Sequence, residues 1–196
     1  METSLLDADY WQNRYAQNDT PWDIGYVSPP LLRFFDELHD KHACILIPGA
    51  GSAYEAVYLH RLGFDNVWVC DWAPRAFDYL NMQAPGFPES HKLVADYFEL
   101  DLQVDFIIEQ TFFCALDPDL RQNYARKTAS LLKPGGILAG VLFNVYFEKA
   151  GPPFGGSAEE YKAIFSPYFD LLEMSPCVTS ISPRAGRELW VRFKKK

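Results

Sequence analysis

Two glycines and an aspartate have the types and the spacing needed to bind a nucleoside. Gly49 and Gly51 follow a short apolar run at residues 45–47, and Asp71 ends a second apolar run at residues 67–70. Glycines let the backbone turn sharply and let a ligand lie against it. In doubly wound folds, an acidic side chain about 20 residues after such a turn binds the two ribose hydroxyls. The spacing therefore predicts a cofactor that contains a nucleoside.

The residues around the glycine turn favour S-adenosylmethionine among such cofactors. Dinucleotide binding requires a small last residue in G-x-G-x-x-G/A, and this chain has Tyr54 there, which disfavours a nicotinamide oxidoreductase. No Walker lysine follows the turn, so a triphosphate is not expected. S-adenosylmethionine carries ribose and adenine without phosphate and fits better. A non-catalytic protein that binds this cofactor stays an open alternative.

Three aromatic residues, Trp11, Tyr15 and Trp22, lie in a polar, turn-rich leader before the first strand. The rings either dock the leader on the core or close over the cofactor as a lid, where they would contact a sulfonium through apolar and cation–π interactions. Asp96 follows the third expected strand. Its carboxylate would accept the exocyclic amine of adenine, and the next backbone N–H, that of Tyr97, would serve a ring nitrogen.

The acceptor side is expected to position the reactants rather than to exchange protons. A sulfonium is an activated methyl donor, so transfer to a soft anion needs in-line positioning, and we expect no obligatory catalytic residue. Arg184 would hold an anionic acceptor or favour a thiolate, and Arg14 and Tyr15 are weaker candidates for that role. Cys114 has no histidine in a related motif, which favours packing over a nucleophilic role. Aromatic residues that would form a dry wall around the acceptor are Phe112, Phe113, Tyr146, Phe147 and Phe154.

The elements that must position these residues alternate between strand and helix, which predicts a doubly wound α/β fold. Ligands lie beyond the carboxyl ends of the strands in such sheets, so the residues after the fourth strand should face the reacting centre. A Lys-Pro-Gly-Gly turn at residues 133–136 is expected before the fifth strand. Strands are expected at residues 45–47, 67–70, 92–95, 104–109, 137–143, 169–174 and 189–193, and helices over 53–62 and 75–82 and from residues 28, 117 and 157 onward.

The composition of the whole chain bounds its class. The chain has 196 residues, 48% of them hydrophobic, and a formal net charge of -8, which fits one globular domain and disfavours a nucleic-acid partner. We expect one domain over residues 1–196, with a lid at 1–27 and a sheet core at 28–196. Without signal-peptide features or a membrane-spanning apolar run, we expect a cytoplasmic monomer that acts on a small molecule. The four dispersed cysteines are expected to be reduced thiols that hold no metal.

Taken together, these motifs resemble those of the thiopurine S-methyltransferase family, and most of all the plant halide/thiol methyltransferases. The resemblance implies a Rossmann-like class I methyltransferase fold with a seven-stranded, mostly parallel sheet, helices on both faces and an antiparallel last strand. It also implies in-line methyl transfer from S-adenosylmethionine to a thiol, a thiopurine or a halide. The motifs that carry it are Trp11 with Thr-Pro-Trp22, Ile-Pro-Gly-Ala-Gly51, Asp71, Asp-Tyr-Phe98, Phe-Phe-Cys-Ala115, Leu-Lys-Pro-Gly135 and Gly-Pro-Pro153.

The resemblance further implies roles for single residues. The chain departs from the plant enzymes at Ser52 and Ala53, where they have a richer glycine run, and at Tyr15, where they have tryptophan. It also departs at Gln110 and Phe154, where they have tyrosine. These changes leave the expected cofactor in place and leave the acceptor open. By this likeness Trp11, Tyr15 and Trp22 match the aromatics that cover the cofactor, and Gly49, Asp71, Asp96, Tyr97 and Gln110 match cofactor-binding positions.

Overall fold

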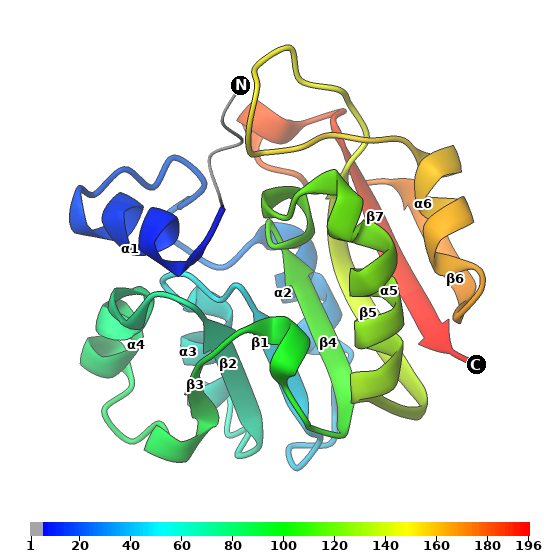
Figure 1. The fold of residues 1–196 in the computed structure, drawn as a ribbon. Coiled ribbons are helices and arrows are strands. Elements are labelled where there is room, and N and C mark those ends of the chain that lie inside the picture. The colour runs from blue at the N-terminus through cyan, green and yellow to red at the C-terminus, as the bar shows by residue number, and fades with distance from the viewer. Residues whose placement is uncertain (1–5) are drawn as a thin grey trace.

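Seven strands form a single mixed sheet in the computed structural model, which describes residues 6–196 (Figure 1). The strands are β1 (Ile45–Pro48), β2 (Val67–Asp71), β3 (Lys92–Val94), β4 (Val104–Gln110), β5 (Leu132–Phe143), β6 (Phe169–Pro176) and β7 (Glu188–Lys195). Their order across the sheet is β3-β2-β1-β4-β5-β7-β6. The first five strands run parallel, whereas β7 is antiparallel to both β5 and β6. The expected doubly wound sheet with an antiparallel last strand is confirmed.

Helices cover both faces of the sheet. Helix α1 (Ala8–Ala16) belongs to the lid (Figure 1), and the helices on the faces are α2 (Pro29–Asp36), α3 (Tyr54–Arg61), α4 (Asp78–Gln83), α5 (Arg121–Leu131) and α6 (Ala158–Phe165). Buried side chains of α2, α3 and α4 share one apolar layer with the sheet, and those of α5 and α6 share the other. Strand β1 lies between the two layers, because Leu46 packs into the second layer and Ile45 and Ile47 pack into the first. Burial on both faces explains the continuous apolar run of this strand.

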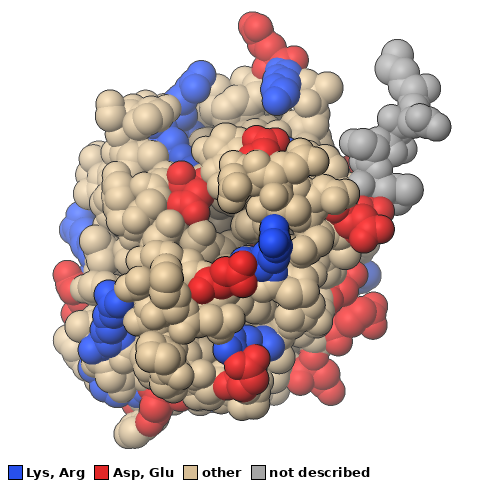
Figure 2. All heavy atoms as spheres, turned by 90° about the vertical axis from the view of Figure 1, so that its left-hand side faces the viewer, with Lys and Arg blue, Asp and Glu red and all other residues tan. Residues whose placement is uncertain are grey.

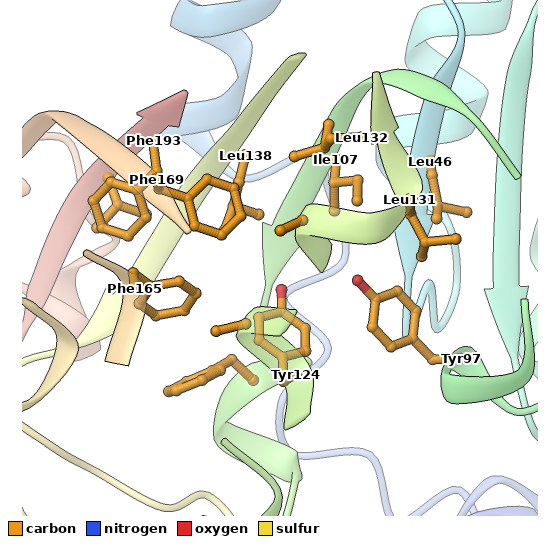
Figure 3. Close-up of a cluster of buried hydrophobic side chains, with 14 of the residues drawn as sticks. Leu46, Tyr97, Ile107, Tyr124, Leu131, Leu132, Leu138, Phe165, Phe169 and Phe193 are labelled. Atoms are coloured by element: carbon orange, nitrogen blue, oxygen red, sulfur yellow. The ribbon is translucent and has the colours of Figure 1, made fainter. Parts of the chain in front are cut away.

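Large aromatic side chains fill the layer under α5 and α6 (Figure 3). Phe165 of α6 packs on Phe193 of β7, with ring centroids 5.1 Å apart, and on Phe169 of β6 at 6.0 Å. Tyr97 and Tyr124 stack side by side, with centroids 5.5 Å apart. Buried aromatics contribute large apolar areas, so this layer fixes α5, α6 and the last two strands to the sheet.

The leader is more regular than its sequence predicts. Residues 8–16 form helix α1, in which Asp7 is the N-cap and its carboxylate accepts a hydrogen bond from the Tyr10 backbone N–H at 2.9 Å. None of the residues in α1 is fully buried, so the helix lacks the apolar stripe by which helices are recognised in a sequence. Residues 1–5 of the expected lid lie outside the described residues.

The expected turn at residues 133–136 is also corrected. Strand β5 already begins at Leu132, which pairs with Val104 of β4, and the next pair joins Phe106 to Ile137. The residues between these pairs therefore bulge out of a continuous strand instead of preceding it. Gly135 has a φ of +76°, a conformation that glycine adopts without steric cost.

The surface beside the lid carries charges of both signs. Lys and Arg side chains alternate with Asp and Glu side chains over the face that Figure 2 presents. Within residues 6–196, no helix has the length and the apolar character needed to cross a membrane.

Candidate active site

A cavity of about 810 Å³ lies at the carboxyl ends of β1, β2 and β4. Its wall combines the lid with the ends of these strands and with three later segments, at residues 111–120, 143–153 and 183–187. Ligands of open α/β sheets bind at this edge, and volumes of about 300–1,000 Å³ are typical of cofactor and small-molecule sites. The wall includes these residues that the sequence singled out: Trp11, Arg14, Tyr15, Trp22, Gly49, Asp71, Asp96, Tyr97, Phe112, Phe147 and Arg184.

The glycine turn is left-handed at both glycines, with φ of +55° at Gly49 and +52° at Gly51. A Cβ atom on Gly49 would overlap the side chain of Phe112, so this glycine is required for close packing between the turn and the acceptor side. A Cβ atom on Gly51 would lie 3.2 Å from the Tyr15 hydroxyl. The turn therefore brings the lid, the strand end and the acceptor wall together.

Asp71 ends β2 and is fixed by backbone groups on either side. Its Oδ2 accepts a hydrogen bond from Gly51 N at 3.1 Å, and its Oδ1 accepts one from Ala73 N at 3.0 Å. Burial raises the pKa of this carboxyl, and the backbone donors oppose that rise. A carboxylate offers about four acceptor positions, so Asp71 can still accept hydrogen bonds from two hydroxyls of a ribose.

Asp96 lies beyond β3 and caps the short 3₁₀ helix at Tyr97–Glu99. Its Oδ1 accepts a hydrogen bond from Phe98 N at 2.8 Å, which orients the carboxylate at the cavity wall. Tyr97 turns its ring into the core, where its hydroxyl lies 2.8 Å from Thr128 Oγ1. This arrangement suits the recognition of an adenine edge by the Asp96 carboxylate and by the backbone.

The lid rings pack on one another at the cavity. Trp22 meets Trp11 and Tyr15 edge to face, with centroid distances of 5.5 and 5.8 Å. The Arg14 guanidinium lies 5.0 Å from the Trp22 ring centroid and forms a 2.7 Å ion pair with Asp19. Burial, and next the nearby Asp71, raise the pKa of Tyr15, so its hydroxyl stays protonated. The rings thus provide an apolar, electron-rich surface suited to a sulfonium.

Two contacts join the lid to the rest of the site. The Asp23 carboxylate accepts hydrogen bonds from Ser52 Oγ at 2.5 Å and from Tyr54 Oη at 3.3 Å. At the other end of the cavity, Arg184 Nη2 donates to the Trp22 carbonyl at 3.0 Å. The Ser52 hydroxyl thus fastens the lid to the glycine turn.

The acceptor side carries aromatic and cationic side chains. Arg184 is half-buried, lies 3.6 Å from Glu188 and sits 5.9 Å from the Phe143 ring centroid. The Arg187 guanidinium lies 5.9 Å from the ring centroid of Phe147. All of these except Glu188 line the cavity. An apolar wall that carries two guanidinium groups is suited to an anionic or polarisable acceptor.

The cavity thiols are not poised for nucleophilic chemistry. Cys70 and Cys114 line the cavity but are buried, and burial raises the pKa of each to about 12. The thiol of Cys114 donates to the Thr111 carbonyl at 3.3 Å. A protonated thiol is a weak nucleophile, which agrees with a packing role. Within residues 6–196, no cluster of histidine, cysteine and carboxylate side chains could hold a metal ion.

Five of the singled-out residues do not belong to the wall that the described residues form. Phe113 is 1% exposed and packs on Tyr124 at 5.2 Å, because the 3₁₀ helix at Phe113–Ala115 turns Phe112 and Cys114 to the cavity and Phe113 to the core. Tyr146 is 69% exposed, and Phe154 lies behind the wall, where its N–H donates to the Cys114 carbonyl. The other two are Gly51, whose N–H is bound by Asp71, and Gln110, whose buried amide oxygen has no hydrogen-bond partner within the described residues.

Several wall residues escaped the sequence reasoning. Trp72 directly follows Asp71, and Phe98 lies two residues after Asp96, so their place in the chain was a usable signal. Phe143 ends β5 and so lies at the carboxyl edge of the sheet, which was also a usable signal, whereas Arg187 carried none, because the insertion of β7 beside β5 is what brings it to the cavity. Glu109 was also missed, although it is buried beneath the wall and binds two of its backbone N–H groups.

Comparison with known proteins agrees with this geometry. The profile of the family described as Thiopurine S-methyltransferase (TPMT) matches residues 6–191. The chain is 29% identical over 194 residues to a protein named probable thiol methyltransferase 2 from Arabidopsis thaliana, an alignment that covers 94% of this chain and 84% of the relative. It is 27% identical over 178 residues to a thiopurine S-methyltransferase from Vibrio cholerae serotype O1, with 82% of each chain covered.

A solved structure shares the fold. It is the 1,6-didemethyltoxoflavin-N1-methyltransferase of Burkholderia thailandensis, solved with bound 1,6-didemethyltoxoflavin and S-adenosylhomocysteine. The TM-score is 0.76 at 19% sequence identity, and the superposition covers 100% of this chain and 89% of that one. At this identity the likeness shows the fold alone.

Proposed function

Because the chain belongs to the thiopurine S-methyltransferase family and is an S-adenosylmethionine-dependent methyltransferase, we propose that it moves a methyl group directly, in line, to a small soft nucleophile. Among thiols, thiopurines and halides, we place thiols first, since the names of the relatives point to sulfur acceptors. The observation that carries the proposal is that the Asp71 carboxylate, the lid rings and a cationic aromatic wall all face one cavity.

The residues present fit S-adenosylmethionine. Asp71 is oriented by two backbone donors to accept ribose hydroxyls, and Asp96 is oriented by a third to accept an adenine amine. Trp11, Tyr15 and Trp22 offer ring faces and edges to the sulfonium. When bound, the cofactor supplies an electrophilic methyl group that needs no further activation. The acceptor, not the cofactor, must therefore be prepared by the protein.

Preparation of the acceptor consists of orientation and exclusion of water. Phe112, Phe143 and Phe147 line an apolar chamber that would strip water from a thiolate. Correct placement of two reactants can contribute on the order of 7 to 11 kcal/mol in favourable systems. No general base is required if the acceptor enters as an anion, and Arg184 is the residue that we propose attracts it. Arg14 is less suited, because its 2.7 Å ion pair with Asp19 is closer than the 3.6 Å pair between Arg184 and Glu188.

A transfer assay tests the proposal. The protein is incubated with methyl-labelled S-adenosylmethionine and one acceptor per reaction, taken from a panel of thiols, thiopurines, iodide and thiocyanate. Volatile products are collected from the headspace. We expect labelled methyl thioethers, and loss of the label transfer in the D71A variant. Binding of S-adenosylmethionine without transfer to any acceptor would favour a non-catalytic binding protein. Calorimetric binding of NAD but not of S-adenosylmethionine would end the methyltransferase interpretation.

A further inference from the structure

The turn that follows β4 forms part of the acceptor wall and has a strained backbone. Thr111 has a φ of +62°, in the left-handed region that β-branched residues rarely enter. The turn carries Phe112 against the glycine turn and brings Thr111 and Cys114 to the cavity. A strained conformation persists only where the surroundings over-determine it, and such positions cluster at functional sites. Something beneath the turn must therefore hold it.

Glu109 is the group beneath the turn. Its side chain is almost completely buried, at 1% exposure, and its Oε1 accepts hydrogen bonds from both Phe112 N and Phe113 N at 2.9 Å. Its Oε2 accepts a hydrogen bond from Tyr124 Oη at 2.7 Å. Within residues 6–196 no lysine, arginine or histidine forms an ion pair with it. A buried carboxylate is costly, so three donors aimed at it mark a built arrangement.

We propose, on the basis of the function proposed above, that Glu109 is a positioning residue for methyl transfer. By binding two consecutive backbone N–H groups, its carboxylate holds the strained turn at Thr111. The turn then fixes Phe112 and Cys114 at the acceptor side of the cavity. Glu109 does not itself line the cavity. It acts through the backbone of the turn, and Tyr124 in turn orients its carboxylate. Loss of Glu109 thus lets the wall shift while the cofactor side stays in place.

The surroundings of Glu109 make this control sensitive to pH. Burial raises its pKa to about 7, and the hydrogen bonds from Tyr124 and from the two backbone groups oppose the rise. A charged carboxylate accepts stronger hydrogen bonds than a neutral one, so the turn is held more tightly as pH rises through neutrality. The titratable groups that face Glu109 are Tyr124 from α5, Tyr97 from the turn after β3, Cys114 from the wall, and Glu188 of β7 across a small cavity of about 10 Å³.

The first experiment needs no substrate. Amide hydrogen exchange is measured at Phe112 and Phe113 in the full-length protein for the wild type and for the E109A, E109Q and Y124F variants. We expect E109A to lose protection at these two amides and E109Q to keep part of it, because an amide oxygen still accepts both bonds. The matched control is E55Q: Glu55 is another buried carboxylate, but it binds Ser28 N and lies outside the cavity wall. Unchanged protection in E109A would overturn the proposal.

The second experiment separates positioning from mere stability. In E109A we expect kcat/KM for the acceptor to fall on the order of 10²-fold, the scale of a displacement of about 1 Å, while the Kd for S-adenosylmethionine stays within about twofold. E109Q should recover part of that loss and lose the rise in activity near pH 7, and Y124F should move the rise to higher pH. Equal losses of cofactor and acceptor affinity would contradict a positioning role. Absence of methyl transfer by the wild type would instead contradict the proposed function. The hydrogen-exchange experiment would still test whether Glu109 holds the turn.

Discussion

The two halves of the cavity are built in different ways. The half that we propose binds the cofactor, the cofactor half, comes from short stretches that directly follow consecutive strands: the glycine turn after β1, Asp71 at the end of β2 and Asp96 after β3. The half that we propose binds the acceptor, the acceptor half, comes from three segments that are distant in sequence, at residues 111–120, 143–153 and 183–187. The first half depends on local chain direction at a sheet edge, and the second depends on how β4, β5 and β7 assemble.

The halves also differ in how their carboxylates are held. Asp71 accepts hydrogen bonds from Ala73 N and from Gly51 N of the glycine turn, Asp96 accepts one from Phe98 N, and both side chains line the cavity. Glu109 points away from the cavity and holds the wall from behind. The cofactor half therefore presents Asp71 and Asp96 to the cavity, whereas Glu109 supports the acceptor half from outside the cavity wall, which Arg184 and Arg187 line.

The largest expected effect tests the supporting role of Glu109 through the stability of the fold. Its pKa rises from 4.5 in the unfolded chain to about 7 in the native protein, so between these values the native state holds the extra proton and stability falls as pH rises. One pKa unit corresponds to about 1.4 kcal/mol, so ionisation of Glu109 lowers the free energy of unfolding by about 3 kcal/mol. Urea unfolding of wild type and E109Q from pH 4.5 to 8 should show a decline that is steeper in the wild type by this amount.

The quantity to examine is the difference in the free energy of unfolding between wild type and E109Q at each pH. Burial also raises the pKa of Glu55, Asp71 and Glu188, but these groups titrate in both proteins and cancel in the comparison. A parallel pH dependence in wild type and E109Q would show that Glu109 titrates near its unfolded value. Glu109 would then no longer differ from Asp71 and Asp96 as a buried group that supports the wall.

A smaller effect is expected in the cofactor half, and it should be confined there. Replacing Asp71 by alanine removes an acceptor for ribose hydroxyls and should weaken S-adenosylmethionine binding by about 1 to 3 kcal/mol, the scale of a hydrogen bond to a charged group. Calorimetric titration of the D71A variant measures this loss. D71N is the matched variant, because its amide oxygen keeps one acceptor for the backbone donors and so limits damage to the glycine turn. Unchanged affinity in both variants would remove Asp71 from the site.

The same contrast decides what could be predicted from the sequence. The positions of the glycine turn and of the strand-end aspartate were predictable because both depend on local spacing, and the structure places Gly49 and Asp71 at one cavity. The strands were predictable from apolar runs, whereas α1 was not, since it buries no stripe. On the acceptor side, spacing did not reveal that a 3₁₀ turn would direct Phe112 to the cavity and Phe113 to the core.

Long-range assembly set the other limit on prediction. Arg187 reaches the cavity only because β7 enters the sheet beside β5, and no local motif predicts that pairing. Glu109 resembled an ordinary strand residue in the sequence, and its role depends on Tyr124, which is 15 residues further along the chain. Tertiary contacts of this kind have no signature in periodicity or spacing.

The smallest expected effect concerns the arginine that belongs to both halves. Arg184 lines the acceptor side and also donates to the Trp22 carbonyl of the lid. If its charge attracts the acceptor, R184M should raise KM for anionic thiols by up to about tenfold, or about 1.4 kcal/mol, and R184K should recover most of that loss. The control is R192M, since Arg192 pairs with Glu37 outside the cavity wall. Steady-state kinetics with an anionic and a neutral thiol distinguish attraction of the acceptor from fastening of the lid. Equal increases in KM for both thiols, together with weaker cofactor binding, would mean that Arg184 acts by fastening the lid. The division between the two halves would then not hold at this residue.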